Sequence, residues 1–152
     1  LTPRPFSKVA RMTKNAEVDQ TLLQAAISAR NNAYAPYSKF KVGSAFRLHD
    51  GRIFSGANME NCVLPLTVCA ERNALAAAIA AGAQHGDIAE SFIVVDAPIE
   101  ASPCGACRQV MAEFMDFKAP ITVYNLHNDE YYVSNLDELL PKAFTPAALQ
   151  ED

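Results

Sequence analysis

The run SFIVV at residues 91–95 decides how this chain folds. A short, continuous apolar run predicts a strand that is buried on both faces in the middle of a sheet. Residues 67–81 before it are rich in alanine and stop at Gly82, which predicts a buried helix with a glycine just past its end. Residues 103–117 after it have the pattern of a second helix, so helix and strand alternate around this run.

The segments on either side extend this alternation to the whole domain. Apolar spacing and turn residues predict helices at 17–34 and 135–140, strands at 39–48, 52–57, 121–126 and 131–134, and a terminal turn from Thr145-Pro146. This order predicts an α/β fold, with helices packed on both faces of a mixed five-stranded sheet in three α/β/α layers.

Length and composition indicate one domain. The chain has 152 residues, 50% of them hydrophobic and 20% charged, which is enough for a full core and gives no sign of wholesale disorder. We expect a single domain over residues 15–152. Residues 1–14 contain four basic residues and no acid, which predicts a poorly ordered basic leader, with a transit peptide as the alternative.

The charge of the chain argues against a polymeric or membrane partner. The net charge is −4 and there is no basic stripe and no Trp, whereas proteins that bind polynucleotides carry a basic surface. No apolar run approaches the roughly 18 residues of a membrane span. With no signal-peptide pattern, the four cysteines are expected to be reduced thiols in the cytoplasm rather than two disulfides. The predicted partner is a small molecule.

Three cysteines and one glutamate form the most informative pattern in the chain. Glu71 follows Cys69 by two residues, and Cys104 and Cys107 lie in the segment PCGAC. Three thiolates can hold one Zn²⁺ ion and leave its fourth position open for water. Glu71 is then placed to take and return the proton of that water, which indicates hydrolytic deamination of a nucleobase-type amine.

The expected topology brings the cysteines together. Right-handed crossovers put both helices on one side of the sheet, and their loops then meet at the carboxyl ends of adjacent strands. Each cysteine lies where a helix begins, and the N–H groups there favour thiolate over thiol. Zinc with three thiolates has a net charge of −1, so we expect Arg72 and Arg108 to offset it by donating hydrogen bonds to the sulfurs.

Other interpretations of these residues remain open. A single C-x-x-C pattern also occurs in redox pairs, in halves of structural zinc sites and by chance, and Cys62 as a fourth ligand would make a closed structural site. Glu71 viewed alone would be a solvated residue at a helix start. The joint pattern of C-A-E followed by a C-x-x-C that comes after Pro is much more specific than either half.

Beyond the zinc motif, the chain resembles cytidine deaminases of the small, three-cysteine type over about residues 33–144. The stretches that carry the resemblance are YAPYSKFKVG at 34–43, NMEN at 58–61, CAER at 69–72, SPCGACRQV at 102–110 and ELLP at 138–141. The resemblance implies deamination of free cytidine and 2′-deoxycytidine, with one Zn²⁺ per chain bound by Cys69, Cys104 and Cys107. It also implies a homotetramer in which neighbouring subunits complete each active site.

The resemblance assigns roles to single residues as well. Glu71 would protonate N3 of the base and relay the proton of the water to the departing ammonia. The implied substrate contacts are Phe40 as a pocket wall, Asn58 and Glu60 for the ribose hydroxyls, the backbone of Ala70 for the base carbonyl, the carbonyl of Ser102 for the amine, and Phe144 from a neighbouring subunit. Taken singly, these residues also fit ordinary roles: Phe40 in the core, Asn58 in a turn, Glu60 in solvent and Phe144 as an anchor of the C-terminus.

The chain departs from the family at residues 62–66, CVLPL, where members commonly have two small residues and then an aromatic. Leu64 replaces that aromatic, in a loop that the family places at a subunit interface beside the sugar end of a neighbour's pocket. Deamination of a modified cytosine nucleoside such as blasticidin S is therefore an alternative to cytidine. Glu71 argues against a zinc module without catalysis, and the acidic balance argues against a polynucleotide editor.

Overall fold

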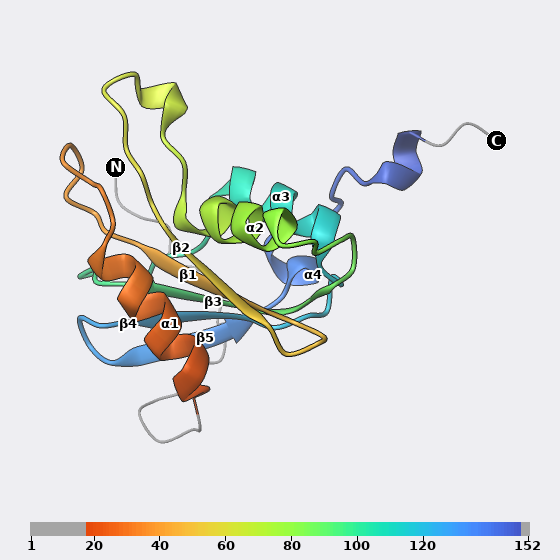
Figure 1. Cartoon of the computed structure of the whole chain (residues 1–152), viewed down its shortest axis with the longest axis horizontal. Helices are drawn as coiled ribbons and strands as arrows, with labels where there is room; N and C mark the ends of the chain where they lie inside the picture. Colours follow the sequence, from red (N-terminus) through yellow and green to blue (C-terminus); the bar gives the residue numbers. More distant parts are fainter. Residues whose placement is uncertain (1–17, 150–152) are drawn as a thin grey trace.

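A mixed five-stranded sheet forms the centre of the fold. The computed structural model describes residues 18–149. The strands are β1 (Gly43–Leu48), β2 (Ile53–Ala57), β3 (Ile88–Val95), β4 (Ile121–Asn125) and β5 (Glu130–Ser134). They lie in the order β2-β1-β3-β4-β5, and only β3 and β4 are parallel neighbours (Figure 1). The prediction of a mixed sheet with β3 as its buried middle strand is confirmed.

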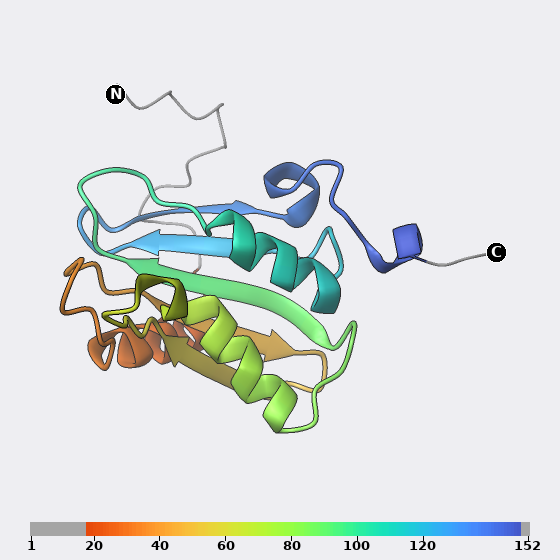
Figure 2. The same cartoon turned by 90° about the horizontal axis from the view of Figure 1, so that it is seen from above.

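Helices cover both faces of this sheet. One face carries α1 (Gln20–Asn31), and the other carries α2 (Ala70–Ala80) and α3 (Gly105–Phe114), as Figures 1 and 2 show. The shorter helices are η1 (Leu64–Leu66), α4 (Leu136–Leu139) and η2 (Pro146–Leu149). The α/β fold with three layers is therefore confirmed. The predicted leader, residues 1–14, lies outside the described range, and its boundary stays a prediction.

The first helix docks through a short apolar face. Asp19 caps α1 by accepting a hydrogen bond from the backbone N–H of Leu22 at 3.0 Å. The buried cluster between this helix and the sheet consists of Leu22, Leu23, Ala26, Ala45, Phe92 and Val94. The helix ends at Asn31, earlier than the sequence predicted, because the backbone of Tyr34 pairs with residues 58 and 60 instead.

The strand predicted from residue 39 begins only at Gly43. Lys39 has a positive φ of 61°, which turns the chain away from an extended path. The side chain of Asn58 then binds the backbone of Phe40 and Val42, with both contacts at 2.8 Å. Residues 40 and 42 are therefore held mainly by this side chain, and the backbone N–H of Asn58 adds one bond to the carbonyl of Val42 at 3.2 Å.

Two crossovers place the helices that carry the cysteines. The units β2-α2-β3 and β3-α3-β4 put both helices on the same face, as predicted (Figure 2). The expectation that their loops leave adjacent strands is wrong for the first unit, because β1 lies between β2 and β3. Both strands are antiparallel to β1 and so run parallel to each other. The loops after β2 and β3 consequently emerge at the same edge of the sheet.

The helix α2 approaches β2 closely. A Cβ atom on Gly56 would lie 2.3 Å from the backbone nitrogen of Ala74, so only glycine permits this contact. Within the helix, Leu75 and Ala78 are buried, whereas Ile79 is 38% exposed. The helix that the sequence predicted to be buried is therefore buried on one face only. No helix within residues 18–149 is long and apolar enough to cross a membrane.

Candidate active site

Three cysteine side chains meet where α2 and α3 begin. Cys69 is the N-cap of α2, Cys104 is the N-cap of α3, and Cys107 lies in the first turn of α3. Their sulfurs all lie within 4.8 Å of one another, and the Sγ atoms of Cys69 and Cys104 are 3.8 Å apart. Because each N-cap residue has an extended backbone, the helices begin at Ala70 and Gly105, later than the sequence predicted.

The three thiols need a cation if all of them are to be anionic. Hydrogen bonds from Cys107, and then from Arg72 and Cys104, lower the pKa of the Cys69 thiol to about 5. The pKa of Cys107 is raised, because its thiol is hydrogen-bonded to Cys69 and its side chain is buried. One thiolate thus opposes the ionisation of the next. Three sulfurs at this spacing fit Zn²⁺, which binds thiolates tetrahedrally and keeps a fourth position for water.

Cys62 does not belong to this group. It is exposed in the loop before η1, where its sulfur contacts the side-chain oxygen of Asn61 at 3.7 Å. Within the described part of the chain, the group that could hold a metal ion consists of Cys69, Cys104 and Cys107. The geometry therefore disfavours the closed four-cysteine site that the sequence left open.

The two arginines next to the ligands behave differently. A terminal nitrogen of Arg72 lies 3.7 Å from the sulfur of Cys69 and donates to the carbonyl of Thr67 at 3.2 Å. Its positive charge lies beside the sulfur cluster. The corresponding prediction for Arg108 is wrong, because its guanidinium reaches back past the helix start and contacts no sulfur. It donates to the carbonyl of Pro103 at 2.7 Å, to the carbonyl of Leu139 at 2.8 Å and to the hydroxyl of Ser102 at 2.7 Å.

Glu71 lines the same cleft as the sulfurs of Cys69 and Cys104. It is only 5% exposed, so it is not the solvated helix-start residue that the sequence left as an alternative. Burial raises the pKa of the Glu71 carboxyl above its ordinary value, and the negative charge on Cys69 adds to the rise. A carboxyl with a raised pKa can accept and release a proton nearer to neutral pH, as a general acid–base group requires.

The cleft has a volume of about 260 Å³. The residues in its lining that the family resemblance implied as substrate contacts are Phe40, Asn58, Glu60, Ala70 and Ser102. The sixth, Phe144, does not line the cleft of its own chain. It is 60% exposed, and its backbone carbonyl accepts a hydrogen bond from the side chain of Gln109 at 2.8 Å.

Sequence reasoning missed the apolar floor of the cleft. Ile93 and Val95 from β3 and Val123 from β4 contribute to its lining. These side chains point to the face that carries α2 and α3, whereas Phe92 and Val94 point to α1. The alternation of side chains along a strand is the signal by which the floor was recognisable.

The side chains of Asn58 and Glu60 form hydrogen bonds to the backbone of the cleft wall, at residues 37–42. The carboxylate of Glu60 accepts hydrogen bonds from the backbone N–H of Tyr37 at 2.8 Å and from the backbone and hydroxyl of Ser38. The bond from the Ser38 side chain is the main reason why the pKa of Glu60 is lowered. The amide of Asn58 still has one N–H and one lone pair beyond its two bonds to residues 40 and 42. Both residues therefore shape the wall and keep some capacity for a ligand.

Comparison with known proteins agrees with this geometry. Residues 16–123 match the family model described as the cytidine and deoxycytidylate deaminase zinc-binding region. A cytidine deaminase of Halalkalibacterium halodurans is 44% identical over 126 residues, which cover 83% of this chain and 93% of that protein. The crystal structure of cytidine deaminase from Burkholderia pseudomallei is 43% identical with a TM-score of 0.79, covering 84% of this chain and 100% of that chain.

A second solved structure, cytidine deaminase from Mycobacterium leprae, is 35% identical with a TM-score of 0.69 and covers 83% of this chain and 100% of that chain. The matched family region contains all three clustered cysteines and extends over most of the chain. We conclude that this protein belongs to the cytidine and deoxycytidylate deaminase family.

Proposed function

We propose that this protein hydrolyses the amino group of free cytidine and 2′-deoxycytidine, giving uridine or 2′-deoxyuridine and ammonia. The observation that carries the proposal is the buried carboxyl of Glu71, which lies in one cleft with Cys69 and Cys104, two of the three cysteines whose sulfurs converge. The family match supports a cytosine nucleoside as the substrate. The reaction serves pyrimidine salvage, and we place it in the cytoplasm.

The chemistry requires one metal ion and one carboxyl. Cys69, Cys104 and Cys107 hold the zinc, which when bound supplies a Lewis acid that activates water at neutral pH. Glu71 accepts a proton from the water, donates it to N3 of the base and later transfers a proton to the departing amine. The oxygen of the water stays on C4 and the amino group leaves as ammonia, so the atoms balance.

The remaining cleft residues hold the nucleoside. The apolar floor and Phe40 suit the flat base. The backbone of Ala70 and the carbonyl of Ser102 serve the base carbonyl and the amine, and Asn58 and Glu60 use their remaining hydrogen-bonding capacity for the sugar hydroxyls. A cleft of about 260 Å³ suits one nucleoside better than a strand of nucleic acid.

A homotetramer with shared active sites is the assembly that we propose. Phe144 is exposed and does not line the cleft of its own chain, so it is available to a neighbouring subunit. Three apolar side chains outside the cleft are exposed: Ile79 on α2 at 38%, and Leu64 and Leu66, in the loop that differs from the family, at 67% and 59%. Contiguous apolar surface marks sites of protein interaction, and we propose that these side chains lie at a subunit interface.

The first test is a panel of nucleosides. We expect the zinc-loaded protein to deaminate cytidine and 2′-deoxycytidine much faster than blasticidin S, because Asn58 and Glu60 suit an unmodified sugar. The loss of cytosine absorbance in the ultraviolet and the release of ammonia measure the reaction. Preference for blasticidin S would assign the altered loop at 62–66 to a modified nucleoside. Failure of zinc-loaded protein to deaminate any of them would contradict the proposed function.

The second test removes the proton relay. Glu71→Gln is expected to lower kcat by about 10²–10⁴-fold, the usual contribution of a general acid–base group. The fold and the zinc content should be retained, because the three sulfurs are unchanged. Steady-state kinetics with cytidine and metal analysis of the same sample provide the measurement. The control is Glu113→Gln on the exposed face of α3, which should keep full activity. Near-normal turnover by Glu71→Gln would show that another group moves the proton.

The third test counts the metal ligands. Cys62→Ala is expected to retain one zinc ion per chain, because its sulfur lies outside the three-cysteine cluster. Cys107→Ala is expected to lose most of the zinc. Elemental analysis after dialysis measures both values. Loss of zinc from Cys62→Ala would reveal a closed structural site and remove the open position that hydrolysis requires.

The fourth test asks whether Phe144 acts across a subunit boundary. Phe144→Ala is expected to raise KM for cytidine about tenfold, as a lost contact between base and aromatic ring would. Refolding it in an equal mixture with Glu71→Gln should restore activity, because some sites then combine an intact Glu71 with an intact Phe144 from the other chain. An activity no greater than the sum of the two separate variants would place Phe144 outside the neighbour's site.

A further inference from the structure

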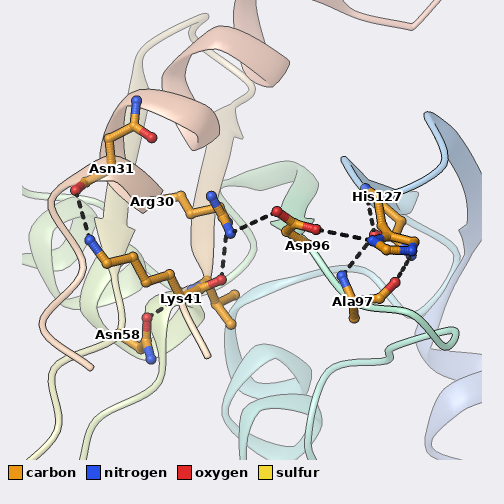
Figure 3. A network of polar contacts seen from close by, with 9 residues as sticks. Arg30, Asn31, Lys41, Asn58, Asp96, Ala97 and His127 are labelled. Carbon is orange, nitrogen blue, oxygen red and sulfur yellow. Dashed lines mark hydrogen bonds and ion pairs between the residues drawn. The ribbon is translucent and has the colours of Figure 1, made fainter. Parts of the chain in front are cut away.

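We propose that Arg30 is a positioning residue for this deamination, and this inference rests on the proposed function. Arg30 lies near the C-terminal end of α1, on the face of the sheet away from the cysteines. From there its guanidinium joins two segments that lead into separate walls of the substrate cleft. These segments are residues 39–42 and the loop that follows β3, and Figure 3 shows Arg30 between them.

The first contact fixes the wall that carries Phe40. The Nε–H group of Arg30 donates to the carbonyl of Lys41 at 3.1 Å. On either side of that carbonyl, the amide of Asn58 binds Phe40 and Val42, each at 2.8 Å. The backbone N–H of Asn58 also donates to the carbonyl of Val42 at 3.2 Å, and the N–H of Phe40 donates to the hydroxyl of Ser38 at 3.0 Å. Arg30 adds the contact at Lys41, between these points, and so helps to determine where the Phe40 ring lies. Figure 3 shows Asn58 and Arg30 reaching the segment from different directions.

The second contact fixes the start of the wall that carries Ser102 and Cys104. A terminal nitrogen of Arg30 lies 3.7 Å from the carboxylate of Asp96, directly after β3. The next residue, Ala97, is held through both its N–H and its carbonyl by the side chain of Asn125, at 3.1 and 2.8 Å. The loop that leads to Ser102 therefore leaves the sheet from a point held on two sides.

The surroundings of Arg30 leave its side chain little freedom. The side chain is 17% exposed, whereas that of Asp96 is 47% exposed. A Cβ atom on Gly43 would lie 2.7 Å from the Cβ of Arg30, so α1 and β1 approach as closely as glycine allows. The planar guanidinium donates to the carbonyl of Lys41 through one nitrogen and faces the carboxylate through another. The single ammonium group of lysine cannot reproduce both contacts in this geometry.

Neither contact involves the metal ligands or Glu71, so we expect a specific kinetic effect. Loss of Arg30 releases both walls, and small displacements of residues that bind the substrate lower catalytic efficiency strongly. Because the walls bind the base and the sugar, KM should rise more than kcat falls. Because the Asp96 carboxylate is 47% exposed, its ion pair with Arg30 is screened by solvent and contributes little to stability, so the melting temperature should change little.

The experiment compares three variants at Arg30 and Asp96 with a control variant at another arginine that forms ion pairs. Arg30→Gln, Arg30→Lys and Asp96→Asn weaken the tie between the walls. The control is Arg47→Gln, because Arg47 on β1 also pairs with α1 and the sheet, through Asp19 at 2.6 Å and Glu90 at 2.9 Å. The wild type and all variants are assayed with cytidine, and their zinc content and melting temperature are recorded.

The expected result is a rise in KM of about tenfold or more for Arg30→Gln and Arg30→Lys, with one zinc ion per chain, and no change in KM for Arg47→Gln. The double variant of Arg30→Gln and Asp96→Asn should have the same KM as Arg30→Gln alone, because the single substitution already removes the contact between the two residues.

Equal KM values for the Arg30 and Arg47 variants would overturn the proposal, whereas a wild type that leaves cytidine unchanged would refute the proposed function instead. Should Arg30→Gln fail to fold, Asp96→Asn tests the contact without altering α1, and His127→Ala is its control, because Asp96 also lies 3.6 Å from the ring of His127. A KM for Asp96→Asn equal to that of the wild type would then reject the tie.

Discussion

Two helix N-termini converge at one edge of the sheet, and each has a cysteine in its N-cap position. The N–H groups at a helix N-terminus have no partner within the helix, so an electron-rich atom is stabilised there. In α3 the sulfur of Cys104 accepts from the N–H of Cys107 at 3.5 Å, which satisfies one such group and orients the ligand. A shift of either helix by one residue would turn its side chains by about 100° and separate the sulfurs. The metal site thus depends on where β2 and β3 end and on how the chain leaves them.

Side chains rather than strands support the irregular backbone around the cleft. Main-chain polar groups need partners, and the segments at 37–42 and 96–104 have few of them in the sheet. Glu60 serves the turn at residues 37 and 38, Asn58 serves residues 40 and 42, and Arg108 serves Pro103. The same few polar residues therefore give the cleft its shape and supply its hydrogen-bonding groups.

Much of this structure was predictable from short patterns in the sequence. The apolar run that became β3 and the alanine-rich α2 identified the layers, and the joint cysteine and glutamate pattern identified the cluster at 69, 104 and 107. The helices and strands near the site were predicted to be longer than they are, because contacts between residues far apart in the sequence end those elements. The pairing of Asn58 with Phe40, for example, spans 18 residues and leaves no periodic signal.

Other features had no local signal at all. Arg108 follows a ligand directly, yet its side chain runs to Pro103 and Leu139, because adjacency in the sequence does not determine the direction that a side chain takes from a helix. The position of β1 between β2 and β3 followed from pairing across the sheet and not from the order of the elements. The link from Arg30 to Asp96 joins residues far apart in the chain and became visible only in three dimensions.

The close seating of α2 on Gly56 also bears on how such an enzyme evolves. Strand β2 and helix α2 are fixed against each other, and the backbone of Met59 pairs with that of Val68, so residues 61–67 form a loop between fixed points. Mutations in its exposed middle, such as the leucine at position 64, leave Cys69 anchored at the helix start. A substitution in this loop can thus change an exposed surface of the protein while the cysteine cluster stays in place.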